Sequence, residues 1–216
     1  MIPSIEYERI PNLRIIPGIS ISSLAAVRSI LLIRRKGTAG IRSVALDTSS
    51  RTSVALTKIL LHANMGIYPE FFPCPPDPVA MLEKCDAALL IGDAALKIRL
   101  EEYESTDLAE QWVLWQQTPF VFAFWACRSD VQLPDDLNAI FREAKNWGLG
   151  KRAEIASVFS RSLELPQAFL EAYLHQNIDF DLGPRHVEGL ERFYRLARQE
   201  NLIPEFRAPQ FLDEAK

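Results

Sequence analysis

A cluster of hydroxyl groups and one guanidinium precedes a predicted helix, in the segment Asp47-Thr48-Ser49-Ser50-Arg51-Thr52-Ser53. The first turn of a helix presents backbone N–H groups, and the helix dipole adds positive potential there, so anions bind readily at such a position. The guanidinium adds a planar fork of donors that suits a carboxylate. A plain helix cap needs one hydroxyl, whereas this turn carries several. We therefore expect an anion-binding site made of Ser49, Ser50, Arg51, Thr52 and Ser53.

A second candidate position is the pair Gly92 and Asp93, which follows an apolar run at 86–91 that is typical of a buried parallel strand. Ligands in open α/β sheets bind at the carboxyl ends of strands, which is where this pair lies. A glycine turn followed by an aspartate helix cap would explain the pair equally well. We include Gly92 and Asp93 in the binding site because the hydroxyl-rich turn is another strand-to-helix junction of the same unit.

Ser29 is a third candidate, because it lies in a predicted strand at 27–34 and shares one face with Val27, Leu31 and Ile33. Three of these four side chains are apolar, so the pattern predicts that the hydroxyl of Ser29 is buried. A buried hydroxyl needs a hydrogen-bond partner, which is either the backbone or a ligand. Both interpretations stay open on the residues alone.

Other residue types that often carry chemistry form no recognisable pattern. The three histidines do not occur as HxxxH or HExxH, and the three cysteines include no CxxC pair, so neither a metal site nor a disulfide scaffold is indicated. The chain also has no glycine-rich nucleotide-binding loop. We therefore expect no metal site and no nucleotide chemistry.

Composition narrows the class of protein and its partners. The chain has 216 residues, of which 48% are hydrophobic and 24% charged, as in an ordinary globular protein. Its 24 basic and 28 acidic side chains give a net charge of −4, which argues against a disordered tail and against a nucleic-acid partner. No apolar stretch is long enough to span a membrane, and the amino terminus lacks a secretory pattern. We expect a cytoplasmic protein with a small-molecule partner; the oligomeric state is not predicted.

Two lobes are predicted from the order of elements. Short strands and helices alternate from 36 to 118, which indicates an α/β unit with a mostly parallel sheet. A strand at 27–34 leads into this unit, and an aromatic strand at 120–127 leads out of it. After that strand the chain is mainly helical, with one short strand at 178–182. We predict a discontinuous lobe one, 1–35 plus 119–216, an inserted lobe two, 36–118, and a ligand-binding cleft between the lobes.

Four segments of the chain are distinctive: PSIEY at 3–7, VALDTSSRTS at 44–53, AALLIGDAAL at 87–96 and PFVFAFWA at 119–126. Together they resemble the chorismate dehydratase family of the futalosine route to menaquinone. The resemblance implies a type II periplasmic-binding-protein fold used by a cytoplasmic lyase. It also implies removal of water from chorismate without a cofactor, which gives 3-[(1-carboxyvinyl)oxy]benzoate.

The resemblance also implies roles for the candidate residues. Chorismate is a dianion, so Ser50, Arg51, Thr52 and Ser53 would hold one of its carboxylates. A serine on the outgoing hinge strand is implicated in the family's chemistry, and it matches Ser29 in VRSIL at 27–31.

Two alternatives of the same fold stay open. A sister family makes 1,4-dihydroxy-6-naphthoate and carries a histidine after the strand that matches 86–91; here Gly92 and Asp93 stand in that place, which favours the dehydratase. A non-catalytic solute-binding module is the second alternative. A decayed fragment without function is a third outcome, which a thermal melt without a cooperative transition would favour.

The resemblance departs from the family pattern at the amino terminus. Family members usually begin with a further strand–helix–strand unit whose first turn carries a Tyr-Leu-Asn motif, and this sequence starts beyond it. The departure predicts either a misplaced start codon or a lobe one truncated at its N-terminus. A truncated lobe would lack one wall of the cleft and would leave a sheet edge unpaired.

Overall fold

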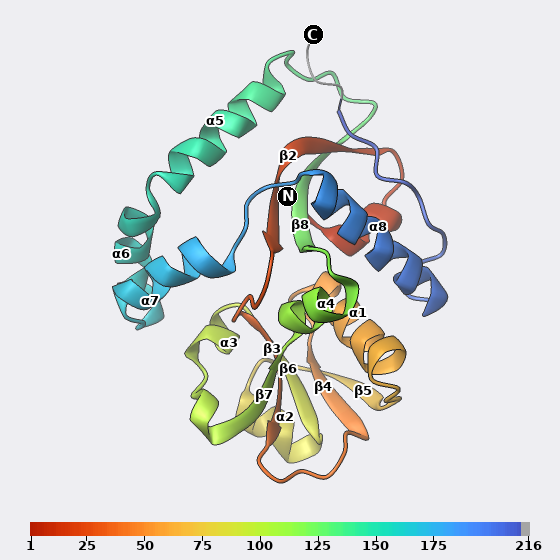
Figure 1. Cartoon of the computed structure of the whole chain (residues 1–216), viewed down its shortest axis with the longest axis vertical. Helices are drawn as coiled ribbons and strands as arrows, with labels where there is room; N and C mark the ends of the chain where they lie inside the picture. Colours follow the sequence, from red (N-terminus) through yellow and green to blue (C-terminus); the bar gives the residue numbers. More distant parts are fainter. Residues whose placement is uncertain (213–216) are drawn as a thin grey trace. The chain divides into compact units, whose positions relative to one another are not determined.

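The computed structural model describes residues 1–212, and the chain divides into two compact units (Figure 1). Unit 1 consists of Met1–Leu24 and the chain from Thr118 onward, and unit 2 is Ala25–Gln117. The first boundary therefore follows Leu24, whereas we had predicted it after residue 35. The reason is that the strand after Leu24 pairs within the sheet of unit 2.

The sheet of unit 2 has five strands, in the spatial order β5 (Glu70–Cys74), β4 (Ser43–Asp47), β6 (Ala87–Ile91), β3 (Ile30–Arg35) and β7 (Tyr103–Asp107). Strand β4 runs parallel to β5 and β6, whereas β3 is antiparallel to β6 and β7. The sheet is thus mixed, where a mostly parallel one was predicted. Alternation of strands and helices predicts parallel neighbours only within the βαβ part, and β3 precedes that part in the chain.

The helices of unit 2 follow its strands in the expected alternation. They are α1 (Arg51–Ile59), continued by the π-helical turn η2 (Leu60–Asn64), α2 (Pro78–Lys84), α3 (Asp93–Lys97), the 3₁₀ turn η3 (Leu100–Glu102) and α4 (Leu108–Gln116). Helix α1 buries Leu56 and Ile59 completely, and the apolar run of β6 is buried from Ala87 to Leu90, as its composition predicted. Each such large side chain contributes about 1.5–3 kcal/mol of stability by leaving water.

The edge strand β7 is an element that the sequence did not reveal. In the structure Glu104 forms an ion pair of 2.6 Å with Arg34 on β3 and accepts a hydrogen bond from the N–H of Gly37. These contacts lower the pKa of the Glu104 carboxyl, the bond from Gly37 most strongly. Cross-strand pairing of opposite charges explains how such a polar sequence forms a strand.

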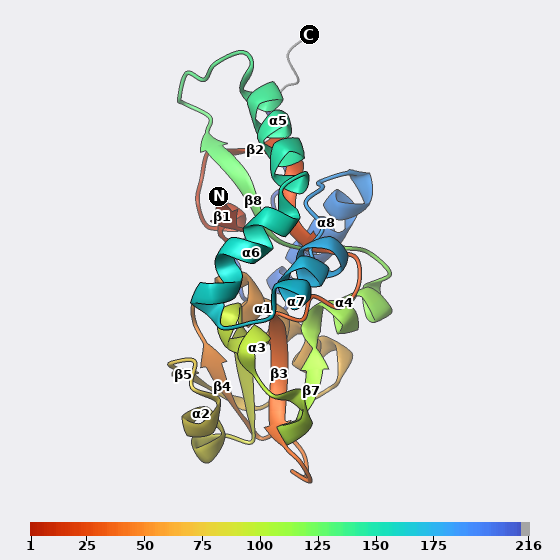
Figure 2. The same cartoon turned by 90° about the vertical axis from the view of Figure 1, so that its left-hand side faces the viewer.

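Unit 1 contains a smaller antiparallel sheet and the three longest of the described helices (Figure 2). Its strands lie in the order β1 (Ile2–Pro3), β8 (Phe120–Arg128) and β2 (Leu13–Ser23), with the 3₁₀ turn η1 (Ser4–Glu8) after β1. The helices are α5 (Leu137–Leu149), α6 (Arg152–Leu163), α7 (Gln167–Ala172) with the π-helical turn η4 (Tyr173–Asn177), and α8 (Pro184–Gln199).

Helix α8 lies close against the segment that precedes β8. A Cβ added at Gly189 would lie 2.2 Å from the carbonyl oxygen of Pro119, so only glycine permits this approach. Tyr194 is fully buried on the same helix and donates a hydrogen bond of 2.7 Å to the carbonyl of Ser4. The strand predicted at 178–182 is reduced to a single bridge between Ser22 and Asp179.

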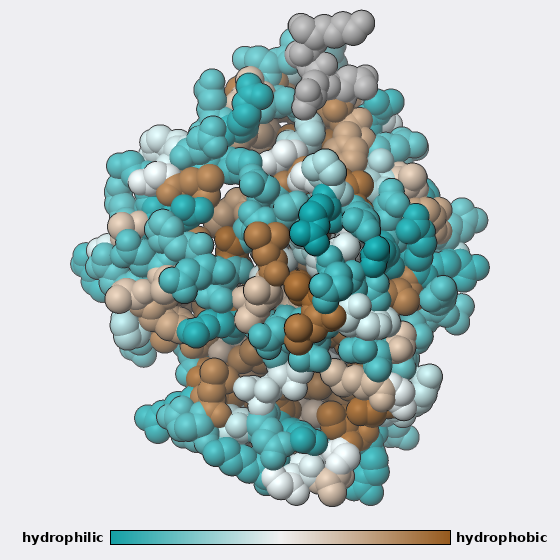
Figure 3. All heavy atoms as spheres, viewed as in Figure 1, coloured by the Kyte–Doolittle hydropathy of each residue, from teal (hydrophilic) through white to brown (hydrophobic). Residues whose placement is uncertain are grey.

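The described helices are short or carry many charges, and none of those in residues 1–212 could cross a membrane. On the face drawn in Figure 3, polar side chains cover most of the surface and apolar ones occur in small groups between them. This distribution is usual for a globular chain in water.

Candidate functional site

The three predicted segments meet at one edge of the sheet of unit 2. Strands β4 and β6 are parallel neighbours, with Leu46 opposite Leu89, so the turns that follow them lie at the same edge. Strand β3 runs the other way, with Ile30 opposite Ile91, so Ser29 lies at this edge as well. We call this edge, where β4 and β6 end and β3 begins, the site edge.

The turn after β4 is held in shape by its own side chains. Ser50 is the N-cap of α1, and its Oγ accepts a hydrogen bond of 3.3 Å from the N–H of Ser53. The hydroxyls of Ser50 and Ser53 are also hydrogen-bonded to each other, at 2.9 Å. Asp47, which is buried, accepts a bond of 2.9 Å from the N–H of Ser49. The helix start is therefore preorganised, which reduces the cost of ordering it around a ligand.

The five predicted residues of this turn divide by exposure. Ser49 and Arg51 are exposed and Ser50 is half-buried, whereas Thr52 and Ser53 are fully buried. The exposed and half-buried side chains are accessible to a ligand at the start of α1. The hydroxyl of Ser53 is placed to support Ser50. Binding by these five residues stays a prediction.

Ser29 and Gly92 are joined directly. The N–H of Gly92 donates a hydrogen bond of 2.7 Å to the carbonyl of Ser29, and Gly92 has φ +60° and ψ −132°, a conformation that suits glycine. Ser29 is buried, as predicted, with 6% of its surface exposed. Asp93 is exposed and begins α3.

The strand predicted at 27–34 begins later than expected. Strand β3 starts at Ile30, because Arg28 has φ +62° and interrupts the extended backbone. This left-handed conformation costs a residue with a Cβ about 1–2 kcal/mol. Gln117 and Glu164 also have positive φ, but they end helices, where that conformation is common.

Asp107 binds the backbone of Arg28, and sequence reasoning missed both residues. One oxygen of Asp107, Oδ2, accepts a hydrogen bond of 2.6 Å from the N–H of Arg28. The other oxygen caps α4 by accepting bonds from the N–H groups of Ala109 and Glu110, at 3.0 and 3.1 Å. The N-cap role of an aspartate before a helix can be predicted from sequence, whereas its bond to a residue 79 positions away cannot.

The histidine of α8 has a structural role. His186 Nε2 lies 2.6 Å from Asp179 Oδ2, and its Nδ1 accepts a hydrogen bond from the N–H of Gly183. Burial raises the pKa of Asp179, but the hydrogen bonds from His186 and from backbone N–H groups outweigh it and lower that pKa overall. Both ring nitrogens of His186 are thus engaged. Within residues 1–212, no three His, Cys, Asp or Glu side chains are grouped so that they could hold a metal ion.

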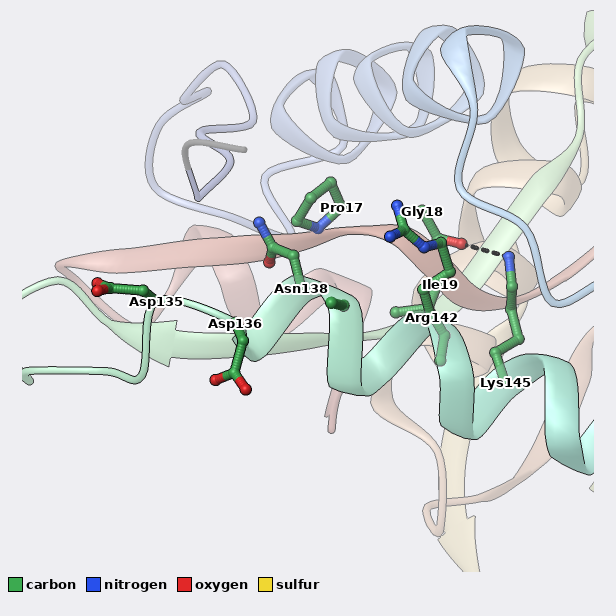
Figure 4. A pocket seen from close by; sticks show the side chains of 9 residues that line it. Pro17, Gly18, Ile19, Asp135, Asp136, Asn138, Arg142 and Lys145 are labelled. Carbon is green, nitrogen blue, oxygen red and sulfur yellow. Dashed lines mark hydrogen bonds between the residues drawn. The ribbon is translucent and has the colours of Figure 1, made fainter. Parts of the chain in front are cut away.

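Unit 1 contains a hollow of about 540 Å³ between β2 and α5 (Figure 4). Lys145 on α5 connects the two walls, because its Nζ donates a hydrogen bond of 2.7 Å to the carbonyl of Gly18 on β2. The same Nζ donates a bond of 2.6 Å to Asp181. Asp135 and Asp136 line the hollow just before α5 begins, and Arg142 lines it from α5 together with Lys145. Such a mixed lining favours neither an anion nor a cation, and none of the predicted site residues line it.

Solved structures share the fold. Protein AF1704 of Archaeoglobus fulgidus matches with a TM-score of 0.70 and 17% identity, over 93% of this chain and 78% of that one. The periplasmic aliphatic sulphonate-binding protein SsuA of Escherichia coli matches with a TM-score of 0.59 and 12% identity, over 97% and 74%. These likenesses confirm the predicted α/β fold of the periplasmic-binding-protein type.

A sequence relative is more informative. The chain is 33% identical over 199 residues to chorismate dehydratase of Thermus thermophilus. The match covers 84% of this chain and 72% of that protein. A family model described as menaquinone biosynthesis matches residues 1–199. The similarity thus includes both units and the site edge. The chain belongs to the menaquinone-biosynthesis family.

Proposed function

We propose that this protein is a lyase that removes water from chorismate and forms 3-[(1-carboxyvinyl)oxy]benzoate without a cofactor. The relative from Thermus thermophilus is named a chorismate dehydratase, and its similarity extends over most of both chains. Membership of the menaquinone-biosynthesis family supports the same assignment.

The observation that carries this proposal is the meeting of the three predicted segments at the site edge. Chorismate carries two carboxylates, so its site needs donors and positive potential. The start of α1 provides the positive end of a helix dipole, and Arg51 is exposed in its first turn. Each charge-assisted hydrogen bond from such a group contributes about 1.5–3 kcal/mol. One carboxylate would bind at Ser49, Ser50 and Arg51.

The reaction itself requires little chemical assistance from the protein. A ring C–H bond breaks, its electron pair forms the third double bond of the ring, and the neighbouring hydroxyl leaves as water after taking up a proton. The ring becomes aromatic, which provides the driving force. The protein has to orient the substrate and to assist proton movement.

Ser29 is the residue we assign to that assistance. It is buried at the site edge, and its carbonyl is fixed by the N–H of Gly92. In our proposal its hydroxyl forms a hydrogen bond to the leaving hydroxyl group of the substrate, a bond that strengthens as the C–O bond breaks. Gly92 and Asp93 would line the substrate beside it.

The experiment is incubation of the purified chain with chorismate, followed by chromatography and mass spectrometry. We expect a product lighter than chorismate by one water, with the ultraviolet spectrum of a substituted benzoate. A chain denatured by heat is the control, because chorismate also decays spontaneously. A folded chain that binds chorismate but forms no product above that control would overturn the enzyme proposal and favour a solute-binding module.

A further inference from the structure

We propose that Asp107 is a positioning residue for Ser29, which it controls through the backbone of Arg28. This inference rests on the proposed function, because it assigns Ser29 to the chemistry. Asp107 ends β7 and lies opposite Leu31 of β3, so it reaches the residues that precede β3. Its Oδ2 accepts a 2.6 Å hydrogen bond from the N–H of Arg28, the residue before Ser29.

Two hydrogen bonds thus hold the backbone around Ser29, one at the peptide between Val27 and Arg28 and one at the carbonyl of Ser29 itself. The N–H of Arg28 is bound by Asp107 from the β7 side, and the carbonyl of Ser29 is bound by the N–H of Gly92 from the β6 side. The β3 ladder begins only at Ile30, so it does not fix the peptide between Arg28 and Ser29. The bond from Asp107 comes from outside the ladder and restrains the backbone one residue before Ser29.

The backbone conformation of Arg28 makes this bond necessary. Its φ of +62° is unfavourable for a residue with a Cβ, and the chain would relax toward an extended conformation without a compensating contact. That relaxation would rotate the following peptide and move Ser29. A displacement of about 1 Å at a reacting group can lower a rate by about 100-fold.

The structure offers a matched control for this residue. Asp77 caps α2 as Asp107 caps α4, with one oxygen accepting from the N–H groups of Val79 and Ala80 at 3.0 and 3.1 Å. Serine caps helices about as well as aspartate does, but its single short oxygen cannot also reach a distant N–H. Asp107→Ser therefore keeps the cap and loses the bond to Arg28, whereas Asp77→Ser only exchanges one cap for another.

The test measures turnover of chorismate and thermal unfolding for both variants. We expect Asp107→Ser to lower kcat by roughly 10- to 100-fold with KM within about twofold, and Asp77→Ser to leave both unchanged. Adding Arg28→Gly to Asp107→Ser should recover most of kcat, because glycine adopts positive φ without strain. An unchanged kcat in Asp107→Ser, an equal loss in Asp77→Ser or a failed recovery in the double variant would each overturn the proposal.

Amide hydrogen exchange gives a readout that does not depend on activity. We expect the amides of Arg28 and Gly92 to exchange at least tenfold faster in Asp107→Ser than in the wild type, and at the wild-type rate in Asp77→Ser. An unchanged Gly92 amide would overturn the positioning role even if kcat falls. Absence of product in the wild type, together with faster Gly92 exchange in Asp107→Ser, would refute the proposed function. It would still support the positioning of the Ser29 backbone by Asp107.

Discussion

The N–H of Gly92 donates a 2.7 Å hydrogen bond to the carbonyl of Ser29, and this bond ties the turn after β6 to the residue before β3. Two segments that lie 63 positions apart in the sequence are thereby fixed beside each other at the site edge. The backbone conformation that directs the Gly92 N–H at Ser29 has φ +60°. The identity of residue 92 therefore affects both stability and the placement of Ser29.

Gly92→Ala should lower the free energy of unfolding by about 1–3 kcal/mol, because alanine is strained at this φ and ψ. A Cβ at this position would meet nothing within 4 Å, so the loss is conformational and not steric. Gly148→Ala in α5 is the control: Gly148 also has open space and has no positive φ, so alanine should raise stability by about 0.5–1 kcal/mol there. Urea denaturation of the two variants measures both effects. Equal changes of the same sign would contradict the argument from φ.

Arg51→Ala should weaken chorismate binding by roughly 10- to 100-fold, the equivalent of about 1.5–3 kcal/mol for one charge-assisted contact. Unfolding should change by less than about 0.5 kcal/mol, because Arg51 is exposed. Arg42→Ala removes an exposed guanidinium just before β4 begins, at the opposite end of that strand, and should leave binding unchanged. Titration calorimetry gives the two affinities. A wild-type affinity in Arg51→Ala would remove this residue from the binding site.

Ser29→Ala should lower kcat by about 100-fold while KM changes by less than about twofold, because the proposed hydrogen bond strengthens only in the transition state. Ser43→Ala serves as the control. Its hydroxyl accepts a 3.0 Å bond from the N–H of Asp86 at the other end of the sheet, so its loss should cost stability but no activity. Steady-state kinetics on both variants decides the matter. Unchanged kinetics in Ser29→Ala would leave its hydroxyl with a structural role only.

Local sequence patterns located the residues that lie at the site edge better than they located the contacts that support them. The hydroxyl-rich turn was recognisable because a helix cap and an anion site use the same residue types at a helix start. The positive φ of Arg28 has no such signature, since arginine usually adopts negative φ. The bond from Asp107 depends on the pairing of β3 with β7, and strand β7 is too polar to be predicted from hydrophobic periodicity. The unpredicted part is thus the part set by tertiary contacts.

We expect Glu8 to make the stability of unit 1 depend on pH. It lies on η1 with 5% of its surface exposed, and burial raises the pKa of its carboxyl from 4.5 to about 7. Hydrogen bonding from the N–H of Arg207 and the nearby Arg207 guanidinium, at 3.8 Å, oppose this rise. Because the folded state binds the proton more tightly than the unfolded state, this group stabilises the fold at low pH, and the contribution is lost as pH rises through about 7.

Glu8→Gln should remove this dependence, because glutamine keeps an acceptor for the N–H of Arg207 and cannot ionise. Relative to the variant, the wild type should lose about 2 kcal/mol of unfolding free energy between about pH 5.5 and pH 8. Glu104→Gln is the control: the pKa of Glu104 is lowered, so that carboxylate stays charged over this range and its difference from the wild type should stay constant. Urea denaturation at the two pH values measures each difference. A pH-independent difference for Glu8→Gln would show that the Glu8 carboxyl has the same charge in the folded chain at both pH values.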